Sequence, residues 1–247
     1  RNAPLANGIR FDRGIEESVI CYRADKERLR FDNNLILGKR GIDVRLKNDG
    51  MVLDIRAEIV DRILEHPPLQ VLMDTPDGDC SFTHKTAGLE VEGTVRLGNK
   101  HWDLKKCNTF AAIDKTVGYH ARKTEWNWAS LAGISNGKVL GLNLTNPTPE
   151  QNVFWVDKEL HRVGPVIFQY TDEYSPWSIK STESDLANIE LEFTPRHSRR
   201  QHINFGVLES RFIQPCGEFS GWFQTTDGQR IEVNNIPGVV EEHFARW

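Results

Sequence analysis

The sequence IDVRLKNDGMVLDIRAEI, residues 42–59, decides the fold class. Its apolar side chains occupy alternate positions on both sides of the tetrapeptide KNDG, residues 47–50. Successive side chains of a β-strand point to opposite faces, so this alternation predicts two strands with one apolar and one polar face. A short Asn-Asp-Gly connection is typical of a tight hairpin turn. These residues therefore predict an antiparallel hairpin in a sheet that is covered on one side.

The same alternation recurs along the chain, in residues 89–97, 140–144 and 189–193, and no long amphipathic helix interrupts it. Strands at short spacing with tight turns predict an antiparallel sandwich or barrel. In the first of these strands we expect the apolar residues to face inward and the charged residues outward, namely Leu89, Val91, Val95 and Leu97 against Glu90, Glu92 and Arg96.

One run of hairpins precedes residues 110–133 and another follows them, which predicts two barrel-like halves over residues 1–108 and 109–247. The chain begins with an arginine in a polar, loop-like segment rather than with methionine. We therefore expect the first half to be incomplete at its N-terminus. The sequence does not decide the oligomeric state.

Composition and charge exclude several classes of partner. The formal net charge is −4 and the pI is about 6.1, so the chain as a whole has no basic character that would favour nucleic acid. No apolar run approaches the roughly 20 residues that span a bilayer. The four cysteines are widely scattered, which predicts reduced, mostly buried thiols in a cytoplasmic protein.

No cofactor or metal site is predicted. The histidines lack the close spacing of zinc ligands. The sequence also has no glycine-rich phosphate loop before a helix and no GxSxG nucleophile motif. The basic residues of the segment 196–202 are interpreted as a solvated loop.

Residues 110–133, FAAIDKTVGYHARKTEWNWASLAG, contain the strongest candidate site. Asp114 follows an apolar run, and burial of a carboxyl group raises its pKa and makes it a better proton donor. In a strand, Trp126 and Trp128 share one face and Asn127 takes the other. We predict that these four residues border a pocket. The alternative is that Asp114 caps a turn and both tryptophans belong to the core.

A second polar cluster lies near the C-terminus. Glu241 and His243 are two positions apart, so they share a strand face and could orient a water molecule as general base. The alternative is a strand edge at which Arg246 pairs with a glutamate. Tyr119 is expected at the pocket mouth or in a turn, and His84, in the run SFTHK, is a further candidate ligand contact.

Several of these motifs carry a family resemblance. The runs FTHK at 82–85, WNWAS at 126–130 and EEHFARW at 241–247 resemble the mainly bacterial family called domain of unknown function 2804. The likeness is good over residues 89–247 and loose before them. It implies membership of a family and no particular reaction.

A more distant likeness concerns the acid at 114 followed by Trp-x-Trp at 126–128. This order resembles the hydroxyneurosporene synthase (carotenoid hydratase) and AttH-like group. That resemblance implies two lipocalin-like barrels around an apolar ligand, with Asp114 as the acid that protonates an alkene. The middle residue of Trp-x-Trp is often acidic in that group, whereas here it is Asn127, and an amide is no proton donor of this kind. The fold is therefore a firmer expectation than the reaction.

Three functions remain open from the sequence. The first is a cofactor-independent, acid-catalysed hydratase, cyclase or isomerase acting on an isoprenoid- or lipid-like molecule. The second is a non-catalytic carrier of a small apolar ligand. The third is a carbohydrate-active protein, because tryptophan platforms and paired carboxylates also suit sugars.

Overall fold

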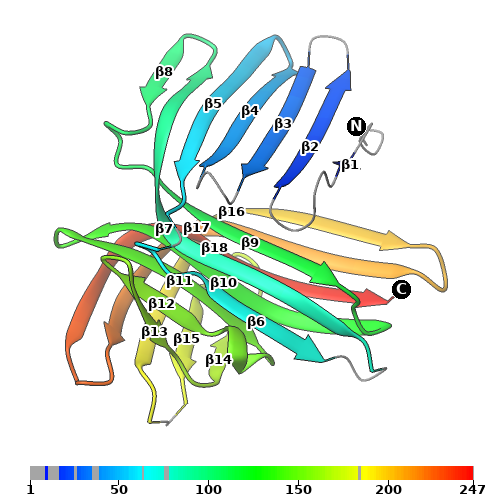
Figure 1. Cartoon of the computed structure of the whole chain (residues 1–247). Coiled ribbons are helices and arrows are strands. Elements are labelled where there is room, and N and C mark those ends of the chain that lie inside the picture. The colour runs from blue at the N-terminus through cyan, green and yellow to red at the C-terminus, as the bar shows by residue number, and fades with distance from the viewer. Residues whose placement is uncertain are drawn as a thin grey trace. The chain divides into compact units, whose positions relative to one another are not determined.

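The computed structural model describes residues 9–10, 17–24, 27–34, 39–62, 64–74, 78–182 and 185–246. Antiparallel β-strands make up most of this part of the chain, and its one helix is the short 3-10 helix η2 (Pro149–Gln151). Two curled antiparallel sheets contain the strands (Figure 1). The all-β prediction is confirmed. No helix among the described residues has the length and apolar character needed to cross a membrane.

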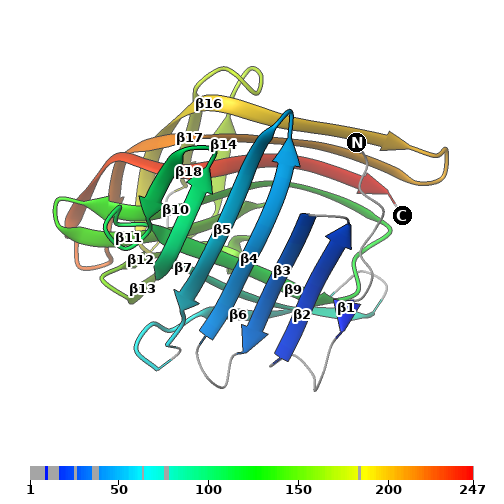
Figure 2. The same cartoon turned by 90° about the horizontal axis from the view of Figure 1, so that it is seen from above.

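The first sheet has the order β1-β2-β3-β4-β5-β7-β6, with β8 and β9 also paired to β7. Its strands β2 to β5 lie side by side in Figure 2. The bounds are β1 (Ile9–Arg10), β2 (Glu17–Ala24), β3 (Glu27–Asn34), β4 (Lys39–Asn48), β5 (Met51–Val60), β6 (Leu69–Asp74), β7 (Cys80–Leu97), β8 (Lys100–Asp103) and β9 (Phe110–Gly118).

The second sheet has the order β13-β12-β11-β10-β18-β17-β16-β15-β14. The bounds are β10 (Lys123–Ser135), β11 (Lys138–Asn146), β12 (Val153–Val156), β13 (Glu159–Arg162), β14 (Val166–Gln169), β15 (Trp177–Ser181), β16 (Asn188–Asn204), β17 (Glu209–Gln224) and β18 (Arg230–Arg246).

The chain forms two compact units that do not follow a single cut. The first consists of residues 1–66 and 89–111, and the second of residues 67–88 and 112–247. Strand β7 therefore contributes its N-terminal part to the second unit and its C-terminal part to the first. The predicted division into residues 1–108 and 109–247 stays a prediction.

In the first unit, strands β4 and β5 form the hairpin that was predicted from residues 42–59. Asn48 pairs with Met51 across the turn, where Asp49 and Gly50 both have positive φ values, 48° and 81°. Val44 lies opposite Ile55, which keeps the apolar side chains on one face. Turn and alternation agree here, so the local sequence was enough to set the register.

Strand β7 buries only part of its apolar face in this unit. Leu89 and Val91 are buried, at 1% and 7% exposure, whereas Val95 is half-buried and Leu97 is 37% exposed. The expectation that all four face a core is therefore correct for the first two and wrong for Leu97. The reason is that the apolar face of the sheet is thinly covered here: Trp102 on β8 is also 38% exposed.

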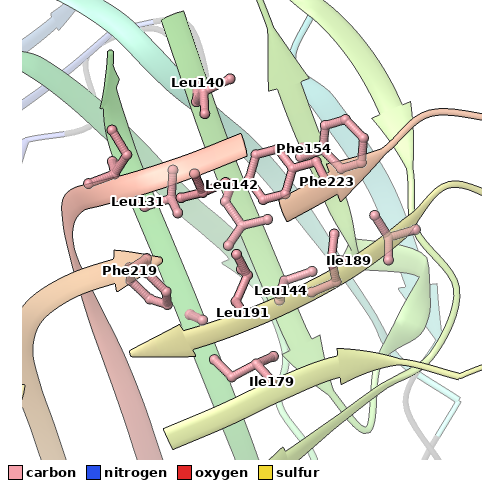
Figure 3. Packing of buried hydrophobic residues seen from close by; sticks show 14 of the residues in the cluster. Leu131, Leu140, Leu142, Leu144, Phe154, Ile179, Ile189, Leu191, Phe219 and Phe223 are labelled. Atoms are coloured by element: carbon pink, nitrogen blue, oxygen red, sulfur yellow. The ribbon is translucent and has the colours of Figure 1, made fainter. Parts of the chain in front are cut away.

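The second unit has a continuous apolar core inside its curled sheet (Figure 3). Ala129 and Leu131 of β10 lie opposite Leu144 and Leu142 of β11, and all four are buried. Full burial of one such leucine side chain stabilises a fold by about 1.5–3 kcal/mol. The space inside this sheet is thus filled by side chains, and Trp126 lies on the opposite face of β10.

A ribbon of β6, β7 and β9 packs against that opposite face within the second unit. A Cβ atom at Gly141 of β11 would lie 2.3 Å from the carbonyl oxygen of Ala87 in β7, so the two backbones approach closely. The indole nitrogen of Trp155 donates to the carbonyl oxygen of Pro67 at 2.9 Å. These contacts hold the ribbon in place and create the space in which the candidate site lies.

Three cysteines are exposed, although the sequence predicted mostly buried thiols. Cys80, Cys107 and Cys216 are exposed and unpaired, so the prediction of mostly buried cysteines is wrong for them. Cys80 begins β7 and Cys107 lies in a turn, where the chain is open to solvent. The side chain of Cys21 lies outside the described residues.

Candidate functional site

The pairing of β10 with β18 brings the two predicted clusters together. Trp126 lies opposite His243 and Trp128 lies opposite Glu241 in this antiparallel pair. Directly opposite residues of neighbouring strands share a face, so the C-terminal strand places a carboxyl group beside the tryptophans. Asp114 reaches the same space from β9, in the ribbon that covers this face.

A pocket of about 520 Å³ lies between the ribbon and this sheet face, and all the residues around it belong to the second unit. It is lined by Met73, Lys85, Asp114, Thr116, His120, Lys123, Thr124, Glu125, Trp126, Trp128, Thr145, Pro147, Thr148, Gln151, Gln214 and Glu241.

Lys85 and Asp114 form an ion pair in this pocket. The distance from Lys85 Nζ to Asp114 Oδ2 is 2.8 Å, and the side chains are 6% and 36% exposed. An ammonium group at this distance stabilises the ionised carboxylate. The arrangement therefore argues against Asp114 as a neutral proton donor, the role that the distant family likeness implied. The partner is Lys85 of β7, which the sequence did not indicate.

Glu241 occupies a different environment from Asp114. Its Oε1 accepts a hydrogen bond from Trp126 Nε1 at 2.8 Å, and its Oε2 accepts one from Gln214 Nε2 at 2.9 Å. Burial raises the pKa of Glu241 above its ordinary value, and the nearby charge of Asp114 adds to this, while the two hydrogen bonds oppose it. Glu241 is 8% exposed. A carboxyl group whose pKa is raised in this way can serve as a proton donor.

A smaller cavity of about 40 Å³ adjoins the pocket. Asp114 and Trp128 line both spaces, and Ser130 and Asn143 line the smaller one. The indole nitrogen of Trp128 donates to Asn143 Oδ1 at 2.8 Å, which fixes the ring. The Trp128 ring thus forms part of the pocket wall, and its indole N–H has a hydrogen-bond partner, as expected for a buried indole.

Asn127 lies on the other face of β10 and does not line the pocket. Its amide nitrogen donates to the Tyr170 hydroxyl at 3.1 Å, and that hydroxyl donates to Glu242. Tyr170 also stacks on Trp177, with ring centroids 3.6 Å apart. Burial, followed by the bond to Glu242, raises the pKa of Tyr170. This second cluster is a closed hydrogen-bonded network.

The other predicted residues lie around the pocket rather than in its lining. The His243 ring makes an edge contact with Trp126, with centroids 4.4 Å apart, and its Nε2 lies 3.0 Å from Ser210 Oγ. Burial lowers the pKa of His243. Tyr119 is 66% exposed, and His84 is buried beside Gln70 in the ribbon. His243 contacts Trp126, whereas Tyr119 and His84 are not among the residues that line the pocket.

Some lining residues had a usable signal in the sequence. Lys85 belongs to the run SFTHKT, six residues of strand-like spacing that contain no turn former. A strand assigned to this run would have suggested that the lysine, if buried, pairs with an acid elsewhere in the chain. Gln214 and Thr145 had no signal of this kind. The Oγ1 atoms of Thr145 and Thr124 are buried, and neither has a hydrogen-bond partner among the described residues.

Comparison with known proteins identifies the family. The model of the family described as domain of unknown function (DUF2804) matches residues 2–247. The chain belongs to the DUF2804 family. A comparison of this DUF2804 protein with curated proteins gives no match.

Two solved structures have a similar fold. The crystal structure of CghA with Sch210972 matches with a TM-score of 0.55 and 9% identity, covering 98% of this chain and 72% of that chain. The crystal structure of CghA matches with a TM-score of 0.54 and 10% identity, with the same coverage. At this identity the likeness concerns the fold alone.

Proposed function

We propose that this DUF2804 protein binds a small, mainly apolar molecule that carries one polar end, in the pocket lined by Trp126, Trp128 and Lys85. A pocket of about 520 Å³ lies within the range of roughly 300–1,000 Å³ that is usual for small-molecule sites. Indole walls suit an apolar body. Polar side chains also line the pocket, among them Lys85, Asp114 and Glu241, which suits a ligand that carries a polar end.

The observation that carries this proposal is the burial of Lys85. Its side chain is 6% exposed, and an ammonium group has three N–H donors. Among the described residues, the carboxylate of Asp114 accepts a hydrogen bond from it at 2.8 Å. Donors left unpaired in a buried site cost free energy, so an acceptor oxygen on the ligand would be bound strongly there. We therefore expect a carboxylate, carbonyl or phenolate oxygen at the polar end.

The hydroxyl groups of Thr124 and Thr145 support the same assignment. Both line the pocket, and Thr145 is 6% exposed. A buried hydroxyl usually has a hydrogen-bond partner. A second polar atom on the ligand would serve this purpose.

If the protein is an enzyme, Glu241 is the proton donor. Protonated Glu241 would transfer its proton to one carbon of an alkene, and the carboxylate left behind would keep its bonds from Trp126 and Gln214. The resulting cation would lie against the tryptophan faces, which attract cations. When water adds to the cation, one water proton would return to Glu241, which completes a hydration. The similar fold of the structure of CghA with Sch210972 supports ligand binding in general.

A fluorescence titration with anilinonaphthalenesulfonate tests the binding proposal, because this probe combines an apolar body with an anionic end. Replacing Lys85 by Met should weaken probe binding about tenfold, the usual effect of losing one charge-assisted hydrogen bond. The matched control is Lys180→Met, which removes a lysine from an exposed ion pair with Glu190 in the same unit. Equal affinities of the two variants, or displacement of the probe by oligosaccharides, would contradict the proposal.

A separate measurement distinguishes enzyme from carrier. The variants Glu241→Gln and Asp114→Asn keep shape and most hydrogen bonds while removing an ionisable group. For an enzyme of the proposed kind, Glu241→Gln should abolish turnover and preserve ligand affinity. If Asp114→Asn abolished turnover and Glu241→Gln did not, the proton would come from Asp114 and our assignment of roles would be wrong.

A further inference from the structure

The hairpin of β16 and β17 ends in a turn at residues 205–208, just past the last paired residues of β18, because β17 pairs with β18 as far as Glu209, opposite Arg246. Strand β15 pairs with β16 only as far as Phe193, opposite Trp177. Residues 194–204 of β16 continue, paired on one side with β17, and reach the turn at 205–208. Figures 1 and 2 both show this hairpin projecting past the strands that precede it. We call residues 194–214 the arm.

The end of the arm presents apolar side chains to solvent. Ile203 is 40% exposed, Phe205 77%, Val207 70% and Leu208 46%. Single exposed apolar residues are ordinary, but four within six positions form a patch.

Hydrogen bonds hold the turn in a defined shape. The Phe205 amide donates to the Leu208 carbonyl at 2.8 Å, and the Gly206 amide donates to Asn204 Oδ1 at 2.9 Å. Arg246 Nη2 donates to the Gly206 carbonyl at 2.8 Å, which ties the turn to β18. Gly206 has a φ of +79°, a conformation that glycine adopts without strain. We call residues 203–208 the tip of the arm. Its backbone has a defined conformation in which the apolar side chains are exposed.

Basic residues follow the tip along the arm. Residues 196–212 contain four arginines and one glutamate, although the whole chain has a net charge of −4. Arg199 lies over the Phe212 ring at 5.6 Å, and Arg211 makes an exposed ion pair with Glu209. Arg200 pairs with the buried carboxylate of Glu173 and is held there. Exposed ion pairs contribute little, so Arg199 and Arg211 can bind phosphate instead.

We propose that the tip of the arm inserts into the surface of an anionic phospholipid bilayer, with Phe205 and Val207 among the acyl chains and the arginines at the phosphates. Apolar side chains flanked by basic ones are the combination that binds such an interface. Residues 196–202, which the sequence suggested were a solvated loop, belong to strand β16, so that interpretation is wrong. This inference rests on the arm alone and is independent of the pocket.

The shape of the tip favours a membrane over a protein partner. A stable protein interface buries about 800 Å² on each side, which usually requires a broad surface. A convex turn with four apolar side chains offers much less than this, whereas a few inserted side chains suffice at a bilayer. The free edge of β16 in the arm carries Pro195 and arginines, which oppose strand addition by a second chain.

Vesicle flotation tests the proposal. The wild-type protein should float with vesicles of equal parts phosphatidylcholine and phosphatidylserine, and more weakly with phosphatidylcholine alone. The double variant Phe205→Asp/Val207→Asp should bind at least about tenfold more weakly, because it replaces inserted apolar groups with charges that the anionic surface repels. Arg199→Glu should weaken binding to the anionic vesicles and leave the weak binding to phosphatidylcholine unchanged.

The matched control is Leu64→Asp, which changes a fully exposed leucine in the first unit, at 101% relative exposure. It should float like the wild type. Thermal unfolding of each variant checks the fold, and Phe205→Ser/Val207→Ser provides a milder change if the aspartates disturb the turn. Absence of wild-type flotation, or equal flotation of the tip variants and the wild type, would overturn the proposal. Loss of a dimer in the tip variants without any vesicle binding would assign the tip to a protein contact instead.

Discussion

Two carboxyl groups share one pocket but have different neighbours. Asp114 lies 2.8 Å from the ammonium group of Lys85, while Glu241 accepts bonds from two neutral donors in a buried place. The two carboxyl groups therefore lie in different environments within one pocket, an arrangement that is common in active sites. The residue types were visible in the sequence. Their neighbours were not, because Lys85 and Asp114 are 29 positions apart.

The raised pKa of Glu241 makes stability depend on pH. Because the folded state favours the protonated carboxyl group, the native protein binds this proton more tightly than the unfolded chain does. The stability that it contributes is present below the ordinary pKa of 4.5 and is lost as the pH rises through the higher folded pKa. We expect Glu241→Gln to remove this part of the pH dependence, so the variant should gain stability relative to wild type from acid to neutral pH. Urea unfolding across this window measures it, and parallel curves for the two proteins would contradict it.

The network on the other face of β10 gives a different expectation. Tyr170→Phe removes the hydroxyl that bonds Asn127 and Glu242, so we expect a loss of about 1 kcal/mol in the free energy of unfolding. Affinity for anilinonaphthalenesulfonate should not change, because this cluster lies outside the pocket. A variant that kept its stability and lost the probe would place Asn127 and Tyr170 in the binding site.

At the level of elements, local signals predicted hairpins and failed for distant pairings. The β4–β5 turn was predictable because alternation and turn residues lie in one continuous segment. The pairing of β10 with β18 joins Trp128 to Glu241 across more than a hundred residues, and no local pattern specifies it. The sequence therefore indicated strand faces and several site residues. It did not indicate that the site would lie outside a packed core, under the ribbon of β6, β7 and β9.

The close approach of β7 to β11 can be tested at Gly141. A methyl group there would overlap the carbonyl oxygen of Ala87, so Gly141→Ala should cost about 1–3 kcal/mol and push the ribbon away from the pocket. Probe affinity should fall with it. Gly137→Ala is the control: its φ of +80° makes alanine unfavourable by about 1–2 kcal/mol, but no atom lies within 4 Å of the new methyl group. Unchanged probe affinity in Gly141→Ala would show that the ribbon does not form the pocket wall.

At the level of the whole molecule, the two units differ in how well their apolar faces are covered. In the second unit, Leu140, Leu142 and Val240 have no measurable exposure. In the first, Leu46 of β4 is 38% exposed, and Met51 of β5 is 56% exposed. Alternation alone made both sheets look alike in the sequence, because the pattern reports which side is apolar and not what covers it.

This difference predicts unequal protection from hydrogen exchange. Amides of β10, β11 and β18 should exchange slowest, at rates set by global unfolding, and those of β4 and β5 faster, through opening of the first unit. Mass spectrometry of peptides from each strand measures this. Equal protection throughout would mean that the chain unfolds as one cooperative block.

The central claim is that an amphipathic molecule binds between the tryptophans and Lys85. A crystal structure of the protein with anilinonaphthalenesulfonate tests it most directly, because it locates the probe as well as detecting it. We expect the rings of the probe to lie against Trp126 and Trp128, with a sulfonate oxygen about 3 Å from Lys85 Nζ. A probe bound only on the apolar face of the first unit, with the pocket filled by neighbouring side chains, would contradict it.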